Sequence, residues 1–307
     1  MIPYVLRRLL GAVPTLLVIV TVAFFMMRIA PGGPFDLERP LNPDIMENIN
    51  RAYNLDKPLW QQYLLYVGGL LQGDLGPSFT RRDFSVVDLF RTGLPVSIQI
   101  GGMAIGLALV LGTALGAIAA LRQNTWADYL VVGTATFGIT IPTFVIAPLL
   151  SLVFGVWMGW LPAGGWGDGS FRNKILPVAT LALPQIAIVA RLTRGATIEA
   201  LRANHVRTAR AYGLPAWNVL VVHTLRAAIL PVVSYLGPTA AALLTGSVVV
   251  ETIFGIPGIG RYFVQGALGR DYTLVMGTVV VIAVFTVVFN LIVDVLYALL
   301  DPRVRYD

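Results

Sequence analysis

The sequence predicts an all-α, polytopic membrane protein with six transmembrane helices. Of its 307 residues, 56% are hydrophobic and only 12% are charged, and the mean hydropathy is +0.76. Soluble domains are about a quarter charged. Most of the basic residues also lie beside apolar runs instead of forming a basic and aromatic patch. These observations exclude an ordinary cytosolic enzyme, a disordered chain and a nucleic-acid-binding protein.

Six stretches without charged side chains account for the predicted helices, because a bilayer core needs about 20 apolar residues in a helix. The shortest, residues 175–190, contains Pro177 and Pro184. It crosses a bilayer if Arg191 and Arg194 lie at its end and reach the headgroups. The predicted spans are residues 9–28, 95–121, 130–158, 175–196, 227–250 and 273–298.

The first span follows Arg7 and Arg8, as the apolar region of a secretory signal peptide also follows basic residues. Its uncharged run exceeds the roughly 7 to 15 residues of such a region. No cleavage pattern of small residues occurs where it ends, at Met27-Arg28-Ile29-Ala30-Pro31. We therefore expect a retained first transmembrane helix.

The basic residues of the short loops predict the orientation, because lysine and arginine in such loops prefer the cytoplasm. The loop at 197–226 carries four arginines and one acid, Glu199. Both termini and this loop are therefore expected inside, and residues 29–94 form a long extracytoplasmic loop. The arginines that support this orientation are Arg7, Arg8, Arg122, Arg202, Arg207, Arg210, Arg226, Arg303 and Arg305.

The outer loop is expected to contain two helices. Asn42-Pro43 reads as an N-cap followed by a first-turn proline, and predicts a helix to about Tyr53. A second helix begins near Pro58 and carries apolar residues at helical spacing. Two alternatives stay open for the second helix: it lies on the outer membrane interface, or it packs on the other helices.

The positions of the two lysines exclude nucleotide hydrolysis by a P-loop in this chain. A phosphate-binding P-loop needs a lysine after glycine, and neither Lys57 nor Lys174 follows one. The glycine-rich cluster at 255–260 follows an apolar span and is interpreted as a structural turn. The chain has no cysteine, and His205 and His223 are interpreted as solvated loop residues rather than a metal site.

One acid, Asp294, lies clearly inside a predicted span. Asn290, Asp294 and Tyr297 share one helix face by their spacing. One interpretation is a polar stretch along a transport path, because charged groups within a bilayer usually face a cavity or a partner. The other, which we favour, is a group that hydrogen-bonds between helices or lies near the inner headgroups.

The inner basic loop predicts a short helix from Glu199 towards Pro215. Leu201, Val206 and Ala209 recur on one side, and Gly213 is a helix-stop residue. The arginines either fix the topology alone or belong to a docking surface for another protein. A loop so long, helical and basic exceeds what topology requires.

Motifs along the whole chain resemble a known family. Arg207-Thr-Ala-Arg-Ala-Tyr-Gly213 resembles the Glu-Ala-Ala-x-x-x-Gly loop of permeases from ATP-binding-cassette (ABC) importers, in the version of the dipeptide and oligopeptide branch. The residues look most like those of the first membrane subunit of an oligopeptide permease. Further matching motifs are Pro31-Gly-Gly-Pro34, Leu55-Asp-Lys-Pro58, Gly73-Asp-Leu-Gly76, His223-Thr-Leu-Arg226, Glu251-Thr-Ile-Phe254, Pro257-Gly258-x-Gly260, Arg270-Asp271 and Asn290-x-x-x-Asp294.

The resemblance implies a type I ABC importer permease fold and a set of partners. A second, homologous permease subunit would complete the translocation path as a heterodimer. Two ATPase subunits would bind ATP and Mg²⁺, and an extracytoplasmic peptide-binding protein would deliver the peptide; this chain itself would bind no cofactor. The residues expected to couple to the ATPases are Val206, Arg207, Thr208, Ala209, Arg210, Ala211, Tyr212 and Gly213.

The function expected from this resemblance is oligopeptide import through a bacterial inner membrane, by a subunit that is not an enzyme. Within the family the alternative cargoes are dipeptides, glutathione or a chelated metal. A stand-alone secondary transporter or channel is less favoured, because a single acid in six spans offers little for an ion site. A membrane enzyme is third, since no nucleophile and base pair is evident.

Overall fold

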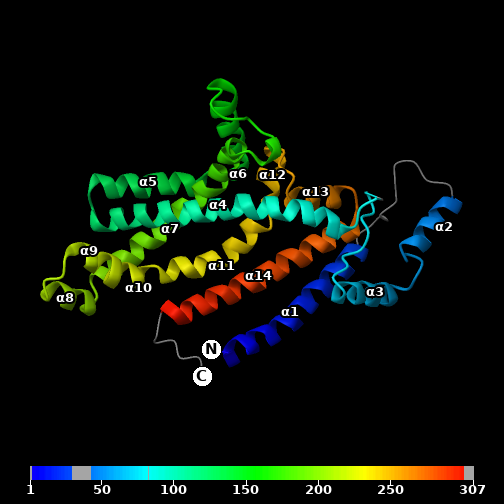
Figure 1. Cartoon of the computed structure of the whole chain (residues 1–307), viewed down its shortest axis with the longest axis horizontal. Helices are drawn as coiled ribbons and strands as arrows, with labels where there is room; N and C mark the ends of the chain where they lie inside the picture. The colour runs from blue at the N-terminus through cyan, green and yellow to red at the C-terminus, as the bar shows by residue number, and fades with distance from the viewer. Residues whose placement is uncertain (1, 30–42, 82, 301–307) are drawn as a thin grey trace.

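The computed structural model describes residues 2–29, 43–81 and 83–300, and these ranges are helical with no β-strand. Long helices run along an elongated molecule (Figure 1). In chain order the helices are α1 (Ile2–Ile29), α2 (Pro43–Ala52), α3 (Leu59–Leu71), α4 (Val86–Leu121), α5 (Trp126–Thr140), α6 (Thr143–Leu150), η1 (Ser151–Trp157), η2 (Gly167–Gly169), α7 (Phe171–Leu201), α8 (Asn204–Ala211), α9 (Ala216–Asn218), η3 (Val219–Leu225), α10 (Arg226–Ala228), α11 (Leu230–Leu244), α12 (Val248–Ile253), α13 (Ile259–Leu268) and α14 (Tyr272–Leu300).

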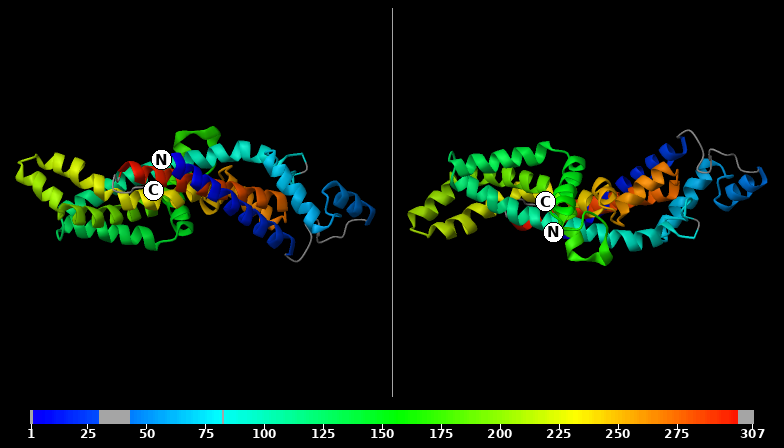
Figure 2. Two further views of the ribbon diagram at one scale, coloured as in Figure 1. Left: turned by 90° about the horizontal axis from the view of Figure 1, so that it is seen from below. Right: turned by 90° about the horizontal axis from the view of Figure 1, so that it is seen from above.

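The predicted all-α membrane fold is confirmed. Four single helices, α1, α4, α7 and α14, are long and apolar enough to span a membrane, as is the segment Leu230–Ile253. α5 followed by α6 and η1 gives a sixth candidate, but its two parts are bent by 102°. α2 and α3 lie at one end of the molecule and α8 and α9 at the other, which the further views also show (Figure 2).

The expected third span, 130–158, is therefore not one straight helix. α5 ends at Thr140, and Ile141 and Pro142 both have extended backbones. A proline ring disfavours the helical conformation in the residue before it, which explains the break at this position. Beyond the break, α6 and η1 project sideways from the long helices (Figure 1).

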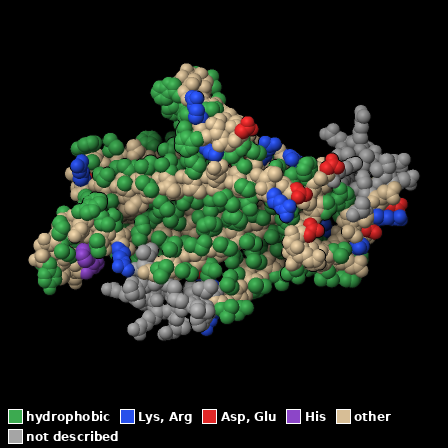
Figure 3. Space-filling model, in the orientation of Figure 1, with side chains coloured by type: hydrophobic (Ala, Val, Ile, Leu, Met, Phe, Trp, Pro, Cys, Tyr) green, Lys and Arg blue, Asp and Glu red, His purple; other side chains and the backbone are tan. Residues whose placement is uncertain are grey.

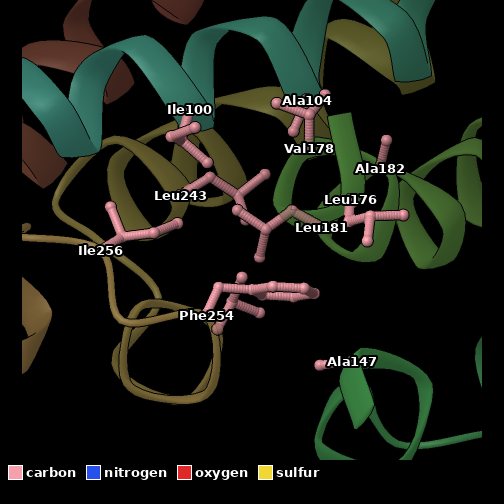
Figure 4. Packing of buried hydrophobic residues seen from close by; sticks show 11 residues of the cluster. Ile100, Ala104, Ala147, Leu176, Val178, Leu181, Ala182, Leu243, Phe254 and Ile256 are labelled. Atoms are coloured by element: carbon pink, nitrogen blue, oxygen red, sulfur yellow. The ribbon is translucent and has the colours of Figure 1, made fainter. Parts of the chain in front are cut away.

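The centre of the fold is the packing of α4 against α7 and α11, and glycines on α4 make it possible. A Cβ at Gly116 would lie 2.4 Å from the Ala190 carbonyl oxygen, and one at Gly101 would lie 2.2 Å from that of Leu243. Such contacts allow two helix backbones to approach closely, as in membrane helix pairs with small interface residues. Ile100, Leu243 and Phe254 belong to the buried cluster beside this contact (Figure 4).

Gly101→Leu is expected to destabilise the chain by about 1–3 kcal/mol, because the new side chain must displace the α11 backbone. Gly102→Leu is the matched control, since the nearest atom to its Cβ is Leu244 Cδ2 at 3.8 Å. Thermal unfolding of both variants in detergent measures the difference. Equal melting temperatures for the two variants would contradict the close contact.

α7 extends further than the predicted fourth span, 175–196, because it continues to Leu201. Arg194 does not simply reach outwards: its guanidinium binds Asp128 of α5 through Nε and Nη2, at 2.5 and 2.7 Å. Arg191 is exposed. The ion pair fixes the start of α5 against the last third of α7.

The outer segment contains both predicted helices, α2 and α3, while the Pro31-Gly-Gly-Pro34 motif lies outside the described residues. α3 packs on α1 through aromatic rings: Phe24 lies 5.4 Å from Tyr63 and 6.0 Å from Tyr66, measured between ring centroids. On its other side Trp60 and Leu64 are exposed. One face of α3 thus packs on α1, as in the second expected arrangement, and the other face is open. A position on the outer membrane interface stays a prediction.

Candidate functional site

α8 is a short amphipathic helix at one end of the molecule (Figure 1). Its apolar face carries Val206 and Ala209, which are buried against Val219 of η3 and packed by Leu201 of α7. The helix predicted from Glu199 to the glycine is interrupted, because Ala203 has an extended backbone between α7 and α8. α8 is therefore a separate element held by two apolar side chains.

The opposite face of α8 is exposed. Arg207, Arg210 and Thr208 point outwards, and Tyr212 is 82% exposed. Trp217, on α9 beside it, is 72% exposed. The ion pairs formed within the described part of the chain involve neither arginine. Basic and aromatic side chains thus lie close together on this face, and the described residues offer the two arginines no ion pair. Arginine, tyrosine and tryptophan are typical of interfaces.

Gly213 ends α8 in a left-handed conformation, with φ +75°. Its N–H donates to the Arg210 carbonyl oxygen at 2.9 Å, and the Leu214 N–H donates to that of Ala209 at 3.3 Å. These bonds satisfy carbonyls at the helix end, and glycine adopts this conformation without steric cost. Apart from Gly213 and its two chain neighbours, no atom of the described residues lies within 4 Å of a Cβ built on Gly213, so the space beside it is open.

A hydrogen bond also ties α8 to the following segment. The His205 Nε2 atom lies 3.1 Å from the carbonyl oxygen of His223. His205 is exposed, as expected for a loop histidine, but it has this backbone partner. The purple histidine atoms mark this end of the molecule in Figure 3.

The polar residues of α14 lie elsewhere in the fold, beside α1 and α11. Asp294 Oδ2 lies 2.9 Å from Arg8 Nε, an ion pair between α14 and α1. Tyr297 donates to the Leu230 carbonyl oxygen at 3.1 Å and contacts Ser234. These contacts join helices to one another, which favours the interhelical interpretation of Asp294 over a polar stretch along a path.

Asn290 packs against α11 at a glycine. A Cβ at Gly237 would lie 3.0 Å from Asn290 Oδ1 and 3.0 Å from Val293 Cγ2. Asn290 and Asp294 both line a groove between α1 and α14. The structure thus places these two residues together and apart from the α8 residues.

A buried carboxylate that the sequence did not single out as a site belongs to Glu251. It accepts hydrogen bonds from Ser97 Oγ at 2.7 Å and from the Arg261 N–H at 3.2 Å. A Cβ at Gly258 would lie 2.2 Å from Glu251 Cδ, and one at Gly246 would lie 2.5 Å from Oε1. Glycines before and after Glu251 therefore leave room for its side chain, and Gly258 and Gly260 are two of them, which explains the Pro257-Gly258-x-Gly260 motif as a structural turn.

A second such carboxylate, Asp271, lies just before α14. It accepts bonds from Ser78 Oγ at 2.5 Å, from the Thr80 N–H at 3.1 Å and from the Leu274 N–H at 3.1 Å. Burial alone would raise the pKa of the Asp271 carboxyl, but these hydrogen bonds outweigh it and hold the pKa below its ordinary value. Asp271 thus caps α14 and ties it to the segment before α4.

Asp271→Ala is expected to lower the free energy of unfolding by about 1–2 kcal/mol, because it removes a helix cap and leaves buried donors unpaired. The pKa of Asp271 is depressed in the folded chain, so its contribution is complete above the ordinary pKa and is lost as the pH falls through the lowered one. Thermal unfolding in detergent at neutral pH and in acid tests both statements. A gap between wild type and variant that does not narrow in acid would contradict the assignment.

The chain is similar to known proteins over its whole length. Residues 112–306 match the family described as binding-protein-dependent transport system inner membrane component, and residues 1–90 match the N-terminal family of such membrane components. The chain is 50% identical over 306 residues to an oligopeptide transport system permease protein, OppB, from Escherichia coli strain K12, and 47% identical to that of Haemophilus influenzae; both matches cover 100% of each chain.

A dipeptide transport system permease protein, DppB, from Bacillus subtilis is 42% identical over 302 residues, covering 98% of this chain and 97% of the relative. A crystal structure of an amino acid ABC transporter has a TM-score of 0.55 and 18% identity, and covers 69% of this chain and 94% of that chain. It supports the fold alone. The chain belongs to the family of inner membrane components of binding-protein-dependent transport systems.

Proposed function

We propose that this chain is one permease subunit of an ABC importer for oligopeptides, located in a bacterial inner membrane. The observation that carries the proposal is the full-length identity of about half with permeases named for oligopeptide transport. In this proposal a second, homologous permease supplies the other half of the path. Two ATPase subunits bind ATP and Mg²⁺, and an extracytoplasmic binding protein delivers the peptide.

In this proposal α8 contacts an ATPase subunit. Its exposed face offers Arg207, Arg210 and Tyr212, and its buried face is anchored on α7 and η3. A movement of the ATPase would therefore be passed to α7 directly and, through η3, to the segment that leads into α11. ATP closes the ATPases, α8 moves with them, and the bundle changes access as a rigid body. ATP biases this change by binding one state more tightly than the other.

The cargo alternatives within the family remain dipeptides, glutathione and chelated metals. The relative named for dipeptide transport is 42% identical, compared with 47% and 50% for the two named for oligopeptides. This difference favours oligopeptides. A stand-alone secondary transporter would move its substrate without any ATPase subunit, so transport by this chain alone distinguishes it from an ABC importer.

The test is to purify the tagged chain from its native membrane, identify the proteins that accompany it, and reconstitute the assembly in liposomes. We expect a second permease and two ATPase subunits to accompany the chain. We also expect the liposomes to take up peptides only when ATP is present on the side of the membrane where the ATPase subunits lie. Accumulation of peptide by liposomes that contain this chain alone would contradict the proposal. If dipeptides are taken up in preference to oligopeptides when both are offered, the proposed cargo is wrong, but the assignment to the family stands.

A further inference from the structure

A groove of about 380 Å³ opens between the first half of α1 and the last half of α14. Apolar side chains from both helices, Leu9 and Ala12 on α1 and Val287 and Leu291 on α14, line part of it. Few residues in the most apolar 18-residue window of either helix are buried within the chain. The groove is therefore open to whatever surrounds these two helices.

Two arginines lie at the groove, and only one has its charge balanced there. Arg8 pairs with Asp294 at 2.9 Å. Arg7 also lines the groove and is exposed, and within the described residues no carboxylate lies within 4.0 Å of it. Among the described residues, the positive charge of Arg7 is therefore not balanced by a carboxylate, and it lies beside the apolar lining.

An amide in the groove also lacks a partner. The half-buried Asn290 side chain lines the groove and forms no hydrogen bond with the residues that the structure describes. An asparagine amide carries two donor hydrogens. A polar group without a partner is costly in a membrane, so an acceptor from outside the chain would stabilise this side chain.

We propose that this groove binds an anionic phospholipid of the cytoplasmic leaflet. The predicted orientation places the start of α1 and the end of α14 on the cytoplasmic side, where lipids with negative headgroups attract basic residues. The phosphate would be recognised by Arg7 and by the donors of Asn290. The acyl chain would lie along Leu9, Val287 and Leu291. A guanidinium beside an apolar groove matches the two chemistries that one lipid molecule combines.

The first test removes the charge. Full-length chain is purified in detergent, stripped of lipid and titrated with phosphatidylglycerol, and the bound fraction is measured by native mass spectrometry. Arg7→Gln is expected to weaken binding about tenfold, the scale of one lost charge-assisted contact. Arg122→Gln is the matched control, because Arg122 is exposed on the same predicted side but lies outside the groove.

The second test fills the groove and leaves every charge in place. Apart from its chain neighbours and the backbone of α1 itself, no atom of the described residues lies within 4 Å of a Cβ built on Gly11. Gly11→Leu therefore places its side chain in the groove without a clash at Cβ. Gly106→Leu is the control, since Gly106 is equally open but belongs to α4. We expect phosphatidylglycerol binding to fall with Gly11→Leu and to stay unchanged with Gly106→Leu.

Two further comparisons identify the ligand. Phosphatidylcholine should bind at least several-fold more weakly than phosphatidylglycerol, and millimolar inorganic phosphate should not displace the bound lipid. If inorganic phosphate displaces the lipid, the groove is a site for a free anion and not for a lipid, and the proposal is overturned. Equal binding of both lipids, or unchanged binding in Arg7→Gln and Gly11→Leu, would also overturn it.

Discussion

Arg207→Glu is expected to reduce ATP-dependent peptide uptake at least about tenfold while the chain remains inserted and folded. The Arg207 side chain is exposed, and none of the ion pairs among the described residues includes it. Reversing its charge therefore has little to disturb within the chain. At an interface, by contrast, truncating one partner of a buried charge pair costs about 2–5 kcal/mol. A large functional loss with an intact fold would locate the contact outside this chain.

Gly213→Asp should give the same separation of function from folding. The backbone of Gly213 has φ +75°, a conformation that favours glycine, but aspartate tolerates it better than most residues. A Cβ built on Gly213 would also meet only its own chain neighbours among the described residues. The substitution therefore costs about 1 kcal/mol within the chain. An ATPase surface lying against Gly213 would meet both a side chain and a negative charge.

Both variants are measured by peptide uptake in liposomes that hold the complete importer and by recovery of the ATPase subunits with the tagged chain. Arg122→Glu serves as the control, because Arg122 is an exposed arginine at the C-terminal end of α4, on the same predicted side. Uptake and ATPase recovery at wild-type levels in Arg207→Glu and Gly213→Asp would remove α8 from the coupling interface.

The presence of α8 was predictable because its signals are local. The apolar positions Val206 and Ala209 and the stop at Gly213 lie within a few residues of one another. Its separation from α7 was not predictable from the same stretch. Nothing in the alanine-rich sequence around Ala203 opposes a continuous helix, and the break depends on how α8 packs against Val219.

Proline content alone could not place the bend of the third span. Pro177 and Pro184 lie inside α7 and Pro238 lies inside α11, yet α7 and α11 continue through them. At Pro142 the helix ends. A proline frees a carbonyl group from its helical hydrogen bond, and the consequence depends on whether neighbouring helices can satisfy that group. Such neighbours are distant in the sequence.

The buried polar contacts were missed for the same reason. Asp128 and Arg194 stand at the ends of two different spans, and Ser97 and Glu251 belong to α4 and α12. From the sequence around it, each residue is predicted only to contact lipid headgroups or to belong to a turn. The motif containing Glu251 was visible, but only the three-dimensional packing shows that its glycines make room for a carboxylate.

Asp128→Ala is expected to lower the free energy of unfolding by about 2–4 kcal/mol, the largest of the stability losses predicted for this chain. The Asp128 side chain is 1% exposed, and it binds Arg194 through both carboxylate oxygens. It also accepts a hydrogen bond from the Asn124 N–H at 3.0 Å. The Arg194 side chain stays 26% exposed, so water offsets part of the cost of leaving its charge unpaired.

The combined variant Asp128→Leu with Arg194→Met separates the loss of the ion pair from the cost of an unpaired charge. Replacing both members of a buried ion pair by apolar side chains is often neutral, whereas removing one member is not. We therefore expect thermal unfolding of the combined variant close to that of wild type and well above that of Asp128→Ala. If the combined variant is as unstable as Asp128→Ala, the hydrogen bonds of the pair, including the one to Asn124, stabilise the contact of α5 with α7. If Asp128→Ala itself unfolds at the wild-type temperature, the pair contributes nothing to that contact.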